Sequence, residues 1–288
     1  MTARFSHFAA IDWSGAQGER HRGIAVALCQ LGDAAPQLVR PGHRWSRPEV
    51  LDWLRRDLPH GTLCGFDLSM ALAHADHGAY FPGLATSPIK ARALWQLVED
   101  LSRGEPHLGA TKVADHPDLA RFFRRHGGRE GAAFEGGRGR FRQTEHAQAG
   151  AGCRPYSNFN LVGAAQVGKG SLAGMRLLHR LSGEIAIWPF DPLPTKGSVL
   201  VEIYTTLAAI AAGRSAARSK IRTGAELDAA LAVLGSAPCL INGAIDDHAS
   251  DALITAAWLR RIHDQPALWS APPSPEIAAT EGWTFGAV

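Results

Sequence analysis

The sequence has no long hydrophobic run and few cysteines. Among its 288 residues, no apolar stretch approaches the roughly 18 residues that a membrane-spanning helix needs. The N-terminus reaches the charged Asp12 too early for the apolar core of a signal peptide. The four cysteines are far apart, and none has the paired spacing of a zinc or redox site: Cys29, Cys64, Cys153 and Cys239. We therefore expect a cytoplasmic protein without a membrane partner.

Two common catalytic signatures are missing as well. The chain contains neither a nucleophile elbow nor a glycine-rich dinucleotide fingerprint, and Ser14 has no base partner that the sequence reveals. These absences argue against a covalent hydrolase and against a dehydrogenase. The net charge of +3 is weak evidence for a nucleic-acid partner, because a compositional bias toward arginine explains it equally well.

The hydrophobic patterns that are present predict a mixed α/β fold. Strands are expected at residues 6–12, 22–29, 37–40 with 43–46, 61–67, 184–189 and 198–204. Helices are expected at residues 47–57, 89–104, 171–182, 226–235 and 247–263. Short connections favour antiparallel pairing of the first three strands, whereas a helical crossover favours a fourth strand parallel to the first.

The length fits one domain over residues 1–288, with a long helical and loop insertion at about 70–185. The proline-rich tail, residues 264–288, is expected to be extended. Within the insertion, residues 121–154 carry eight arginines against three glutamates, with phenylalanines between them. This segment could hold a single nucleic-acid strand by charge and stacking, or it could be a solvated flexible loop.

Acidic residues stand where the expected strands end. Asp12 closes the first strand, Asp67 closes the fourth, and Glu202 lies within the run VLVEIY. A carboxylate at the end of a buried strand is costly unless it is paired or holds a metal ion. Parallel neighbouring strands would bring Asp12 and Asp67 to one edge of the sheet, where α/β proteins form their sites.

The last expected helix supplies a second acidic group. The spacings among Asp247, His248 and Asp251 place them on one helical face. Carboxylates grouped in this way suit Mg²⁺ or Mn²⁺, and two such ions would activate a water and stabilise the leaving oxygen of a phosphodiester. Plainer explanations also exist, because Asp247 could cap the helix, Asp251 could face its dipole and Glu202 could pair with an arginine.

Two weaker patterns lie in loops. Gly-Lys-Gly-Ser, which contains Lys169 and Ser171, precedes an expected helix and could hold a phosphate, although a plain helix start explains it too. His74 and His77 flank Asp76 and could bind a metal, but histidines in polar loops are more often solvated.

Several phrases of the chain resemble one known family. AAIDWSGA, GFDLS, YFPG, LVGAAQVGKGS, IWPFD, VLVEIY and DDHASDALITAAWL are similar, in order and over nearly the whole chain, to the family called domain of unknown function 429. Asp12, Asp67 and the run from His248 to Leu253 resemble the ribonuclease H-like superfamily, most closely its RuvC-type branch of resolvases and related nucleases.

The resemblance implies a ribonuclease H-like mixed sheet, with three antiparallel strands followed by parallel strands and flanked by helices. Asp12 would match the metal-binding acid of the first strand, and Asp67 the fourth-strand acid, which is commonly Glu in resolvases. Asp251 would match the helical acid, with His248 one turn before it. Glu202 has no counterpart in the minimal resolvase pattern, and the Gly- and Arg-rich insertion also departs from it.

Together these patterns predict a nuclease that depends on Mg²⁺ or Mn²⁺. The expected catalytic residues are Asp12, Asp67, Glu202 and Asp251, and the expected metal ligands are Asp12, Asp67, Asp247, His248 and Asp251. The expected substrate contacts are Ser14, Lys169, Ser171, Arg138 and Arg140. Two alternatives stay open: a hydrolase or phosphotransferase for a nucleotide or small phosphorylated ligand, and an inactive binding protein. Many resolvase relatives are dimers, so a homodimer is open too.

Overall fold

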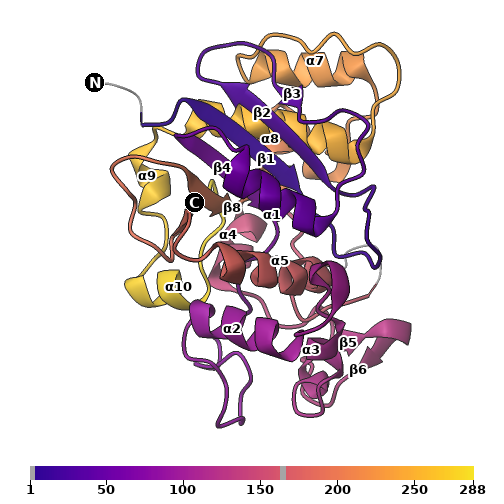
Figure 1. Ribbon diagram of the computed structural model, residues 1–288, viewed down its shortest axis with the longest axis vertical. Helices are drawn as coiled ribbons and strands as arrows, with labels where there is room; N and C mark the ends of the chain where they lie inside the picture. Colours follow the sequence, from indigo (N-terminus) through magenta and orange to yellow (C-terminus); the bar gives the residue numbers. More distant parts are fainter. Residues whose placement is uncertain (1–3, 163–166) are drawn as a thin grey trace.

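The computed structural model describes residues 4–162 and 167–288 as a six-stranded mixed sheet covered by helices (Figure 1). The strand order is β3-β2-β1-β4-β8-β7. The bounds are His7–Asp12 for β1, Ala25–Gln30 for β2, Gln37–Leu38 for β3, Thr62–Asp67 for β4, Ala186–Trp188 for β7 and Val199–Glu202 for β8. The first three strands pair antiparallel, and β4, β8 and β7 continue the sheet in parallel, which confirms the predicted mixed sheet. The third strand is shorter than expected, because residues 43–46 are not in it.

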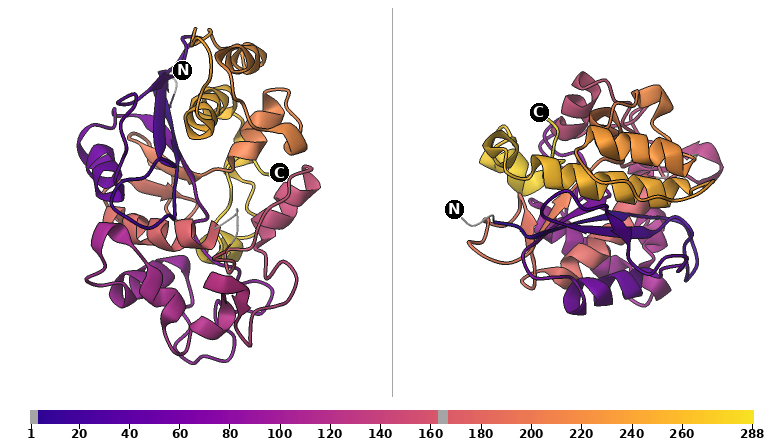
Figure 2. Two further views of the ribbon diagram at one scale, coloured as in Figure 1. Left: turned by 90° about the vertical axis from the view of Figure 1, so that its right-hand side faces the viewer. Right: turned by 90° about the horizontal axis from the view of Figure 1, so that it is seen from above.

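Helices cover both faces of the sheet, which Figure 2 shows nearly edge-on in its left view. One layer contains α1 (Arg47–Arg56), α2 (Ala91–Leu101) and α5 (Val167–Leu181), and the other contains α6 (Thr205–Ala211), α7 (Gly224–Val233) and α8 (Asp247–Ile262). Strand alternation divides the buried side chains between two cores. On β1, Ala9 and Ile11 pack on the α5 side, whereas Phe8 and Ala10 pack on the α8 side.

Side-chain caps fix where the helices begin. Ser46 and Glu49 form a reciprocal capping box at α1, with the cap that the sequence predicted. Thr223 caps α7 through its hydroxyl, which accepts the backbone N–H of Glu226, but the carboxylate of Glu226 accepts from the backbone of Arg222, so the capping box is not reciprocal. At α8 the cap is Asp246, whose carboxylate accepts the backbone N–H groups of residues 248 and 249, so the alternative of Asp247 as the cap is wrong.

The insertion is built from short elements. Besides α2 and α5 it contains α3 (Thr111–Asp115), α4 (Gln143–Gly150), the hairpin of β5 (Arg124–Arg125) and β6 (Arg129–Glu130), and 3₁₀ turns at Pro106–Leu108, Ala120–Phe122 and His126–Gly128. A fourth 3₁₀ turn, Ala216–Arg218, precedes α7. Phe122, Phe123 and Phe134 are buried, with Phe123 packing against Phe81 and Phe159. These rings form the core of the segment. Because they are buried, they are not accessible for stacking on nucleic-acid bases.

The tail folds back onto the sheet. It contains α9 (Pro266–Trp269) and α10 (Pro275–Thr280), so the prediction of an extended tail is wrong for these segments. Trp283 and Phe285 are buried, as expected from their aromatic character, and Phe285 lies edge-on to Trp188.

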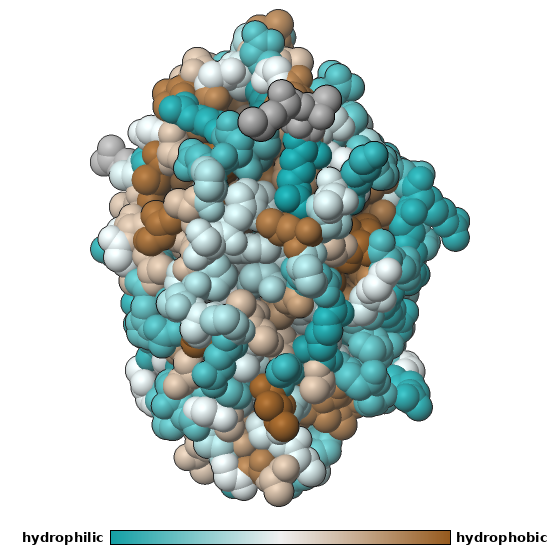
Figure 3. Space-filling model, turned by 90° about the vertical axis from the view of Figure 1, so that its left-hand side faces the viewer, coloured by the Kyte–Doolittle hydropathy of each residue, from teal (hydrophilic) through white to brown (hydrophobic). Residues whose placement is uncertain are grey.

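The outer surface is mixed in polarity. On the face in Figure 3, hydrophilic residues alternate with small hydrophobic patches. Among the helices of the described residues, none combines the length and apolar character required to cross a bilayer.

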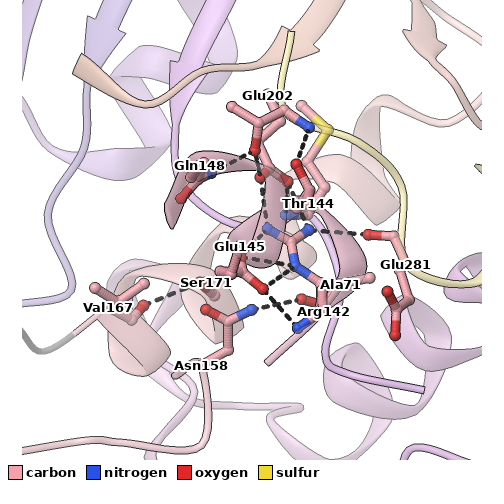
Figure 4. A network of polar contacts seen from close by, with 12 residues as sticks. Ala71, Arg142, Thr144, Glu145, Gln148, Asn158, Val167, Ser171, Glu202 and Glu281 are labelled. Atoms are coloured by element: carbon pink, nitrogen blue, oxygen red, sulfur yellow. Dashed lines mark hydrogen bonds and ion pairs between the residues drawn. The ribbon is translucent and has the colours of Figure 1, made fainter. Parts of the chain in front are cut away.

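A buried arginine joins β8, α4 and the tail (Figure 4). The guanidinium of Arg142 donates to both carboxylate oxygens of Glu202, at 2.6 and 2.8 Å, and to Glu145 at 2.6 Å. It also donates to the backbone carbonyl of Glu281 at 2.9 Å. Burial alone would lower the pKa of Arg142, but the charges of the two glutamates raise it well above its ordinary value. The guanidinium therefore stays charged and holds two acids in the protein interior.

Replacing this arginine should destabilise the fold strongly. We expect Arg142→Met to lower the free energy of unfolding by about 3–5 kcal/mol, because two buried carboxylates lose their counter-charge. Arg103 is exposed and forms a surface ion pair with Asp100, so Arg103→Met should cost less than about 0.5 kcal/mol. Urea denaturation of both variants measures the difference. Equal stability losses would contradict the assigned role of Arg142.

Candidate functional site

Two carboxylates lie side by side at the carboxyl edge of the sheet. Asp12 and Asp67 are direct partners in the parallel pairing of β1 with β4. Neighbouring strands are about 4.8 Å apart, so these two backbones hold the acids close together. Strand alternation sends both side chains toward α8, on the side of Phe8 and Ala10. The strand pairing thus brings the two acids to one edge, as the sequence predicted.

Helix α8 adds two groups to this edge. Nδ1 of His248 lies 2.9 Å from Oδ2 of Asp12, and an N–H there donates to the carboxylate. Asp251, one turn further along the helix, is buried and accepts a hydrogen bond from Nζ of Lys220 at 2.8 Å. Among the described residues, the carboxylate of Asp247 accepts no hydrogen bond from Lys220, but its charge raises the pKa values of Asp251 and Lys220. We call Asp12, Asp67, His248 and Asp251 the acidic cluster.

Ionising all the carboxyl groups of the acidic cluster is energetically unfavourable, because they are buried close to one another. Burial raises the pKa of Asp12 to about 6, although its bond to His248 acts in the opposite direction. Burial, followed by the charges of Asp12 and Asp251, raises the pKa of Asp67 well above its ordinary value. Burial also raises the pKa of Asp251. These acids therefore favour a proton or a cation over sharing the site as bare anions.

Lys220 is a member of the site that the sequence did not reveal. It lies in the loop before α7, with no motif around it, and only the folded chain brings it to Asp251. Burial tends to lower its pKa, but the charge of Asp251 and the hydrogen bond to it raise the pKa overall. Likewise, the hydrogen bond to Asp12 raises the pKa of His248.

A cavity of about 460 Å³ opens onto the cluster, and we call it the acidic cavity. Asp67, His248 and Ser14 contribute to its wall. A Cβ on Gly23 would lie 3.3 Å from Oγ of Ser14 and 3.4 Å from Nε2 of His248. Because glycine has no Cβ, position 23 leaves space for the imidazole ring of His248. Ser14 therefore stands in the site, as expected for a substrate contact.

Glu202 differs from the other predicted catalytic acids. The alternation of β8 places it on the face of Leu200, opposite to Val201, and so away from the face of Asp12 and Asp67. Its oxygens accept bonds from Arg142, from the backbone N–H of Met70 and from the hydroxyl of Thr284. Of the two explanations left open for Glu202, pairing with an arginine is the one found. Its carboxylate holds the wall of the acidic cavity in place.

The acidic cluster is looser than a closed metal site. Among the described residues, the only three acid or histidine side chains whose ligand atoms all lie within 4.8 Å of one another are Asp76, His77 and Glu135. This trio is exposed, and Arg140 already bonds to both oxygens of Asp76. His74, the other histidine of the predicted loop pair, is buried against Tyr80. The trio is therefore compensated by an arginine without a metal.

Two of the predicted phosphate contacts are occupied by the protein itself. Arg140 is buried and donates to the backbone carbonyls of residues 73, 79 and 80 as well as to Asp76. Ser171 lies inside α5, where its hydroxyl donates to the carbonyl of Val167 at 2.9 Å. Neither side chain is free to meet a phosphate, so these two predictions are wrong. The sequence alone could not predict these hydrogen bonds, because the partners of Arg140 and Ser171 come close to them only in the folded chain.

Two further predicted contacts, Arg138 and Lys169, have side chains that reach the solvent. Arg138 is exposed, lies over the ring of Phe141 and bonds to the carbonyl of Pro155. Lys169 is partly exposed in the first turn of α5, which begins at Val167 and thus earlier than expected. Residues 163–166 of the phrase LVGAAQVGKGS lie outside the described residues.

Comparison of the chain with protein-family models, with curated proteins and with solved structures finds no match. The site itself must therefore carry the argument about function.

Removing one acid of the cluster should stabilise the metal-free protein. At pH 8 with a chelator, we expect Asp67→Asn to raise the free energy of unfolding by on the order of 1–2 kcal/mol, because ionised Asp67 costs energy beside Asp12. A carboxyl whose pKa is raised by folding destabilises the protein above its unfolded pKa. The gain should therefore shrink as the pH falls through the raised folded pKa, and it should vanish only below the unfolded pKa of about 3.9, where the carboxyl is protonated in both states.

Urea denaturation at several pH values measures this gain. Asp118→Asn is the matched control, because Asp118 is exposed on the surface and should show no pH-dependent gain. A destabilising effect of Asp67→Asn at pH 8, or a gain that does not change with pH, would contradict the electrostatic account of the cluster.

Proposed function

We propose that this chain is a divalent-metal-dependent phosphodiesterase that acts on nucleic acid. The observation that carries the proposal is the side-by-side placement of Asp12 and Asp67, with Asp251 and His248 facing them from α8. Three carboxylates from three separate elements lie close enough at one edge of the sheet for their charges to interact. Such convergence is what a site for magnesium-like ions needs.

The arrangement of the sheet supports a ribonuclease H-like assignment. Three antiparallel strands are followed by two parallel strands, in the order β3-β2-β1-β4-β8, and the acids lie on the first strand, the fourth strand and a late helix. These are the positions that the resemblance to the RuvC-type branch implies. The strand β7 and the long insertion are additions to that pattern.

The chemistry of the donors fits Mg²⁺ or Mn²⁺. Asp12, Asp67 and Asp251 offer hard oxygen ligands, whereas Nδ1 of His248 is already engaged by Asp12. Bound there, such an ion would stabilise charge on the phosphate and lower the pKa of a water molecule. Chelation requires the acids to come closer together and Lys220 to leave Asp251. The lysine side chain is half exposed and flexible enough to do so.

The protein side chains have separate tasks in this proposal. Asp12 orients His248 through Nδ1, which leaves Nε2 on the cavity side, near Ser14. Nε2 is therefore placed to take a proton from water or to return one to the leaving oxygen. Lys220, once released from Asp251, brings a positive charge to a phosphate oxygen. Ser14 offers a hydroxyl that can hold the substrate in place.

The size of the acidic cavity favours a second candidate function. A cavity of about 460 Å³ falls in the range of small-molecule sites, so a nucleotide or another small phosphorylated ligand would fit. The same acids would then serve hydrolysis or transfer of its phosphate. A panel that contains both polymers and free nucleotides separates the two functions.

Loss of Asp12 should abolish turnover. With Mn²⁺ present, we expect the wild-type protein to cut at least one member of a panel of single-stranded and double-stranded DNA and RNA. Asp12→Asn should reduce this rate by at least about 100-fold, because it removes both a ligand and the partner of His248. Asp118→Asn, a distant exposed change, should cut at the wild-type rate.

Gel electrophoresis of the polymers and phosphate release from nucleotides measure the two activities. Turnover of nucleotides alone would assign the second candidate function. Cleavage that survives in both Asp12→Asn and Asp67→Asn, or that persists in chelator, would contradict the metal-dependent proposal.

A further inference from the structure

A second, larger cavity lies directly beside the acidic one. It measures about 770 Å³ and is lined by residues 15–18, by residues 105–115 in part, and by the first turns of α5. Gly15 and Ala16 contribute to the walls of both cavities. Because Arg47, Arg125 and Lys169 all line it, we call it the basic cavity.

The wall between the two cavities is thin because Gly15 packs against α5. A Cβ on Gly15 would lie 2.3 Å from the backbone nitrogen of Gly170, so only glycine allows this approach. Trp13 fixes the same loop by donating from Nε1 to the carbonyl of Gly170 at 3.0 Å. A ligand in the basic cavity is therefore separated from the acidic cavity by one layer of backbone.

Arg47 brings a buried positive charge to this cavity without an acidic partner among the described residues. The side chain is 3% exposed, and its guanidinium donates only to backbone carbonyls, those of Ser14, Ala16 and His107. A guanidinium has five N–H donors, so two remain after these three bonds. A buried cation that meets only neutral acceptors is unusual unless an anion completes its surroundings.

Two further cations of the basic cavity are available to a ligand. Lys169 forms neither a hydrogen bond nor an ion pair with any residue of the described chain. Arg125 has only a weak contact with the exposed Asp115, at 3.5 Å, and its Nε has no hydrogen-bond partner in the described residues. Glu105, the other acid of the wall, is already engaged by two backbone N–H groups, those of Thr111 and Lys112. The local balance is therefore positive.

A neighbouring histidine, His21, also lies close to the charge of Arg47. His21 is buried, and neither of its ring nitrogens has a hydrogen-bond partner in the described residues. Burial, together with the charges of Arg47 and His107, lowers its pKa to about 4. His21 therefore stays neutral at pH 7, and no acidic side chain of the described residues forms an ion pair with Arg47.

We propose that the basic cavity binds a phosphate group of the substrate, next to the phosphate that reacts at the acidic cluster. Arg47, Arg125 and Lys169 would hold this non-reacting phosphate from three sides. The inference deepens the proposed function and rests on it for the word substrate, but the binding itself does not require catalysis. The ligand chemistry is a phosphate monoester or diester, from either a nucleic-acid strand or a small phosphorylated molecule.

Direct binding in the absence of divalent metal tests the proposal. Inorganic phosphate, measured by calorimetry, and a fluorescent ten-nucleotide oligothymidylate, measured by anisotropy, serve as the two probes, both with a chelator present. We expect Lys169→Gln and Arg125→Gln each to weaken binding about tenfold, since each removes a charged hydrogen-bond donor. For the oligonucleotide, each change should also reduce the slope of log affinity against log salt by about one.

Two control variants make the result specific. Lys196→Gln removes the same charge from an exposed loop outside both cavities and should bind as the wild type does. Asp12→Asn should retain binding while losing turnover. Arg47 is left unchanged in the main test, because its three backbone bonds make Arg47→Met a threat to folding. Thermal denaturation of every variant checks that the fold is intact.

Each outcome decides the inference separately from the proposed function. If both cavity variants bind the oligonucleotide more weakly, the site holds a nucleic-acid phosphate. If both variants lose affinity for inorganic phosphate alone, the site holds a small phosphorylated ligand. If neither probe binds the wild type, or if both variants bind as the control does, the inference is overturned. If the cavity variants bind more weakly but the wild-type protein cleaves no polymer, the proposal of a phosphate site in the basic cavity stands and the nuclease proposal fails. If the wild-type protein cleaves a polymer but the cavity variants bind as the wild type does, the nuclease proposal stands and the phosphate site in the basic cavity is overturned.

Discussion

The central constraint on this molecule is the parallel pairing of β1 with β4, which places Asp12 directly beside Asp67. Two like charges enclosed at one sheet edge repel each other, and burial adds to the cost of ionising both. Two groups offset part of this repulsion: His248 bonds to Asp12, and Lys220 bonds to Asp251, the third acid of the cluster. Carboxyl groups with strongly shifted pKa values cluster at functional sites in proteins, and this makes the edge the candidate site.

The loop after β1 connects this edge to the rest of the protein. Trp13 bonds to α5, Gly15 touches it, and Arg47 of α1 binds the carbonyls of residues 14 and 16. The loop is thereby held between two helices, and it forms the wall that the acidic and basic cavities share. On the far side of the acidic cavity, Arg142 fixes Glu202 and Glu145 in the same way. The cavity walls are thus set by buried arginines, while the cluster itself stays partly uncompensated.

Sequence patterns predicted the parts of the site that depend on local structure. Asp12 and Asp67 end apolar runs, and a helical crossover between the runs makes parallel pairing the expected outcome. The spacing of His248 and Asp251 placed both on one face of a helix whose existence was clear from its length. In these cases strand or helix periodicity alone determined which way the side chains point.

The same patterns failed where a side chain meets a distant partner. From the sequence we expected three side chains to be free for catalysis or substrate binding: Glu202, Arg140 and Ser171. In the folded chain each of them forms hydrogen bonds with other groups of the protein. Lys220 carried no motif at all, and its role follows from the position of one loop beside α8. Long-range contacts of this kind leave no periodic signal, so neither their presence nor their absence could be read from one sequence.

Crystals grown with manganese chloride test the central claim most directly, because anomalous scattering locates the ion without reference to activity. The account predicts a peak about 2.0–2.5 Å from carboxylate oxygens of Asp12 and Asp67, with Lys220 turned away from Asp251. A saturated crystal with no peak at that edge, or with its only peak at Asp76, His77 and Glu135, would contradict it.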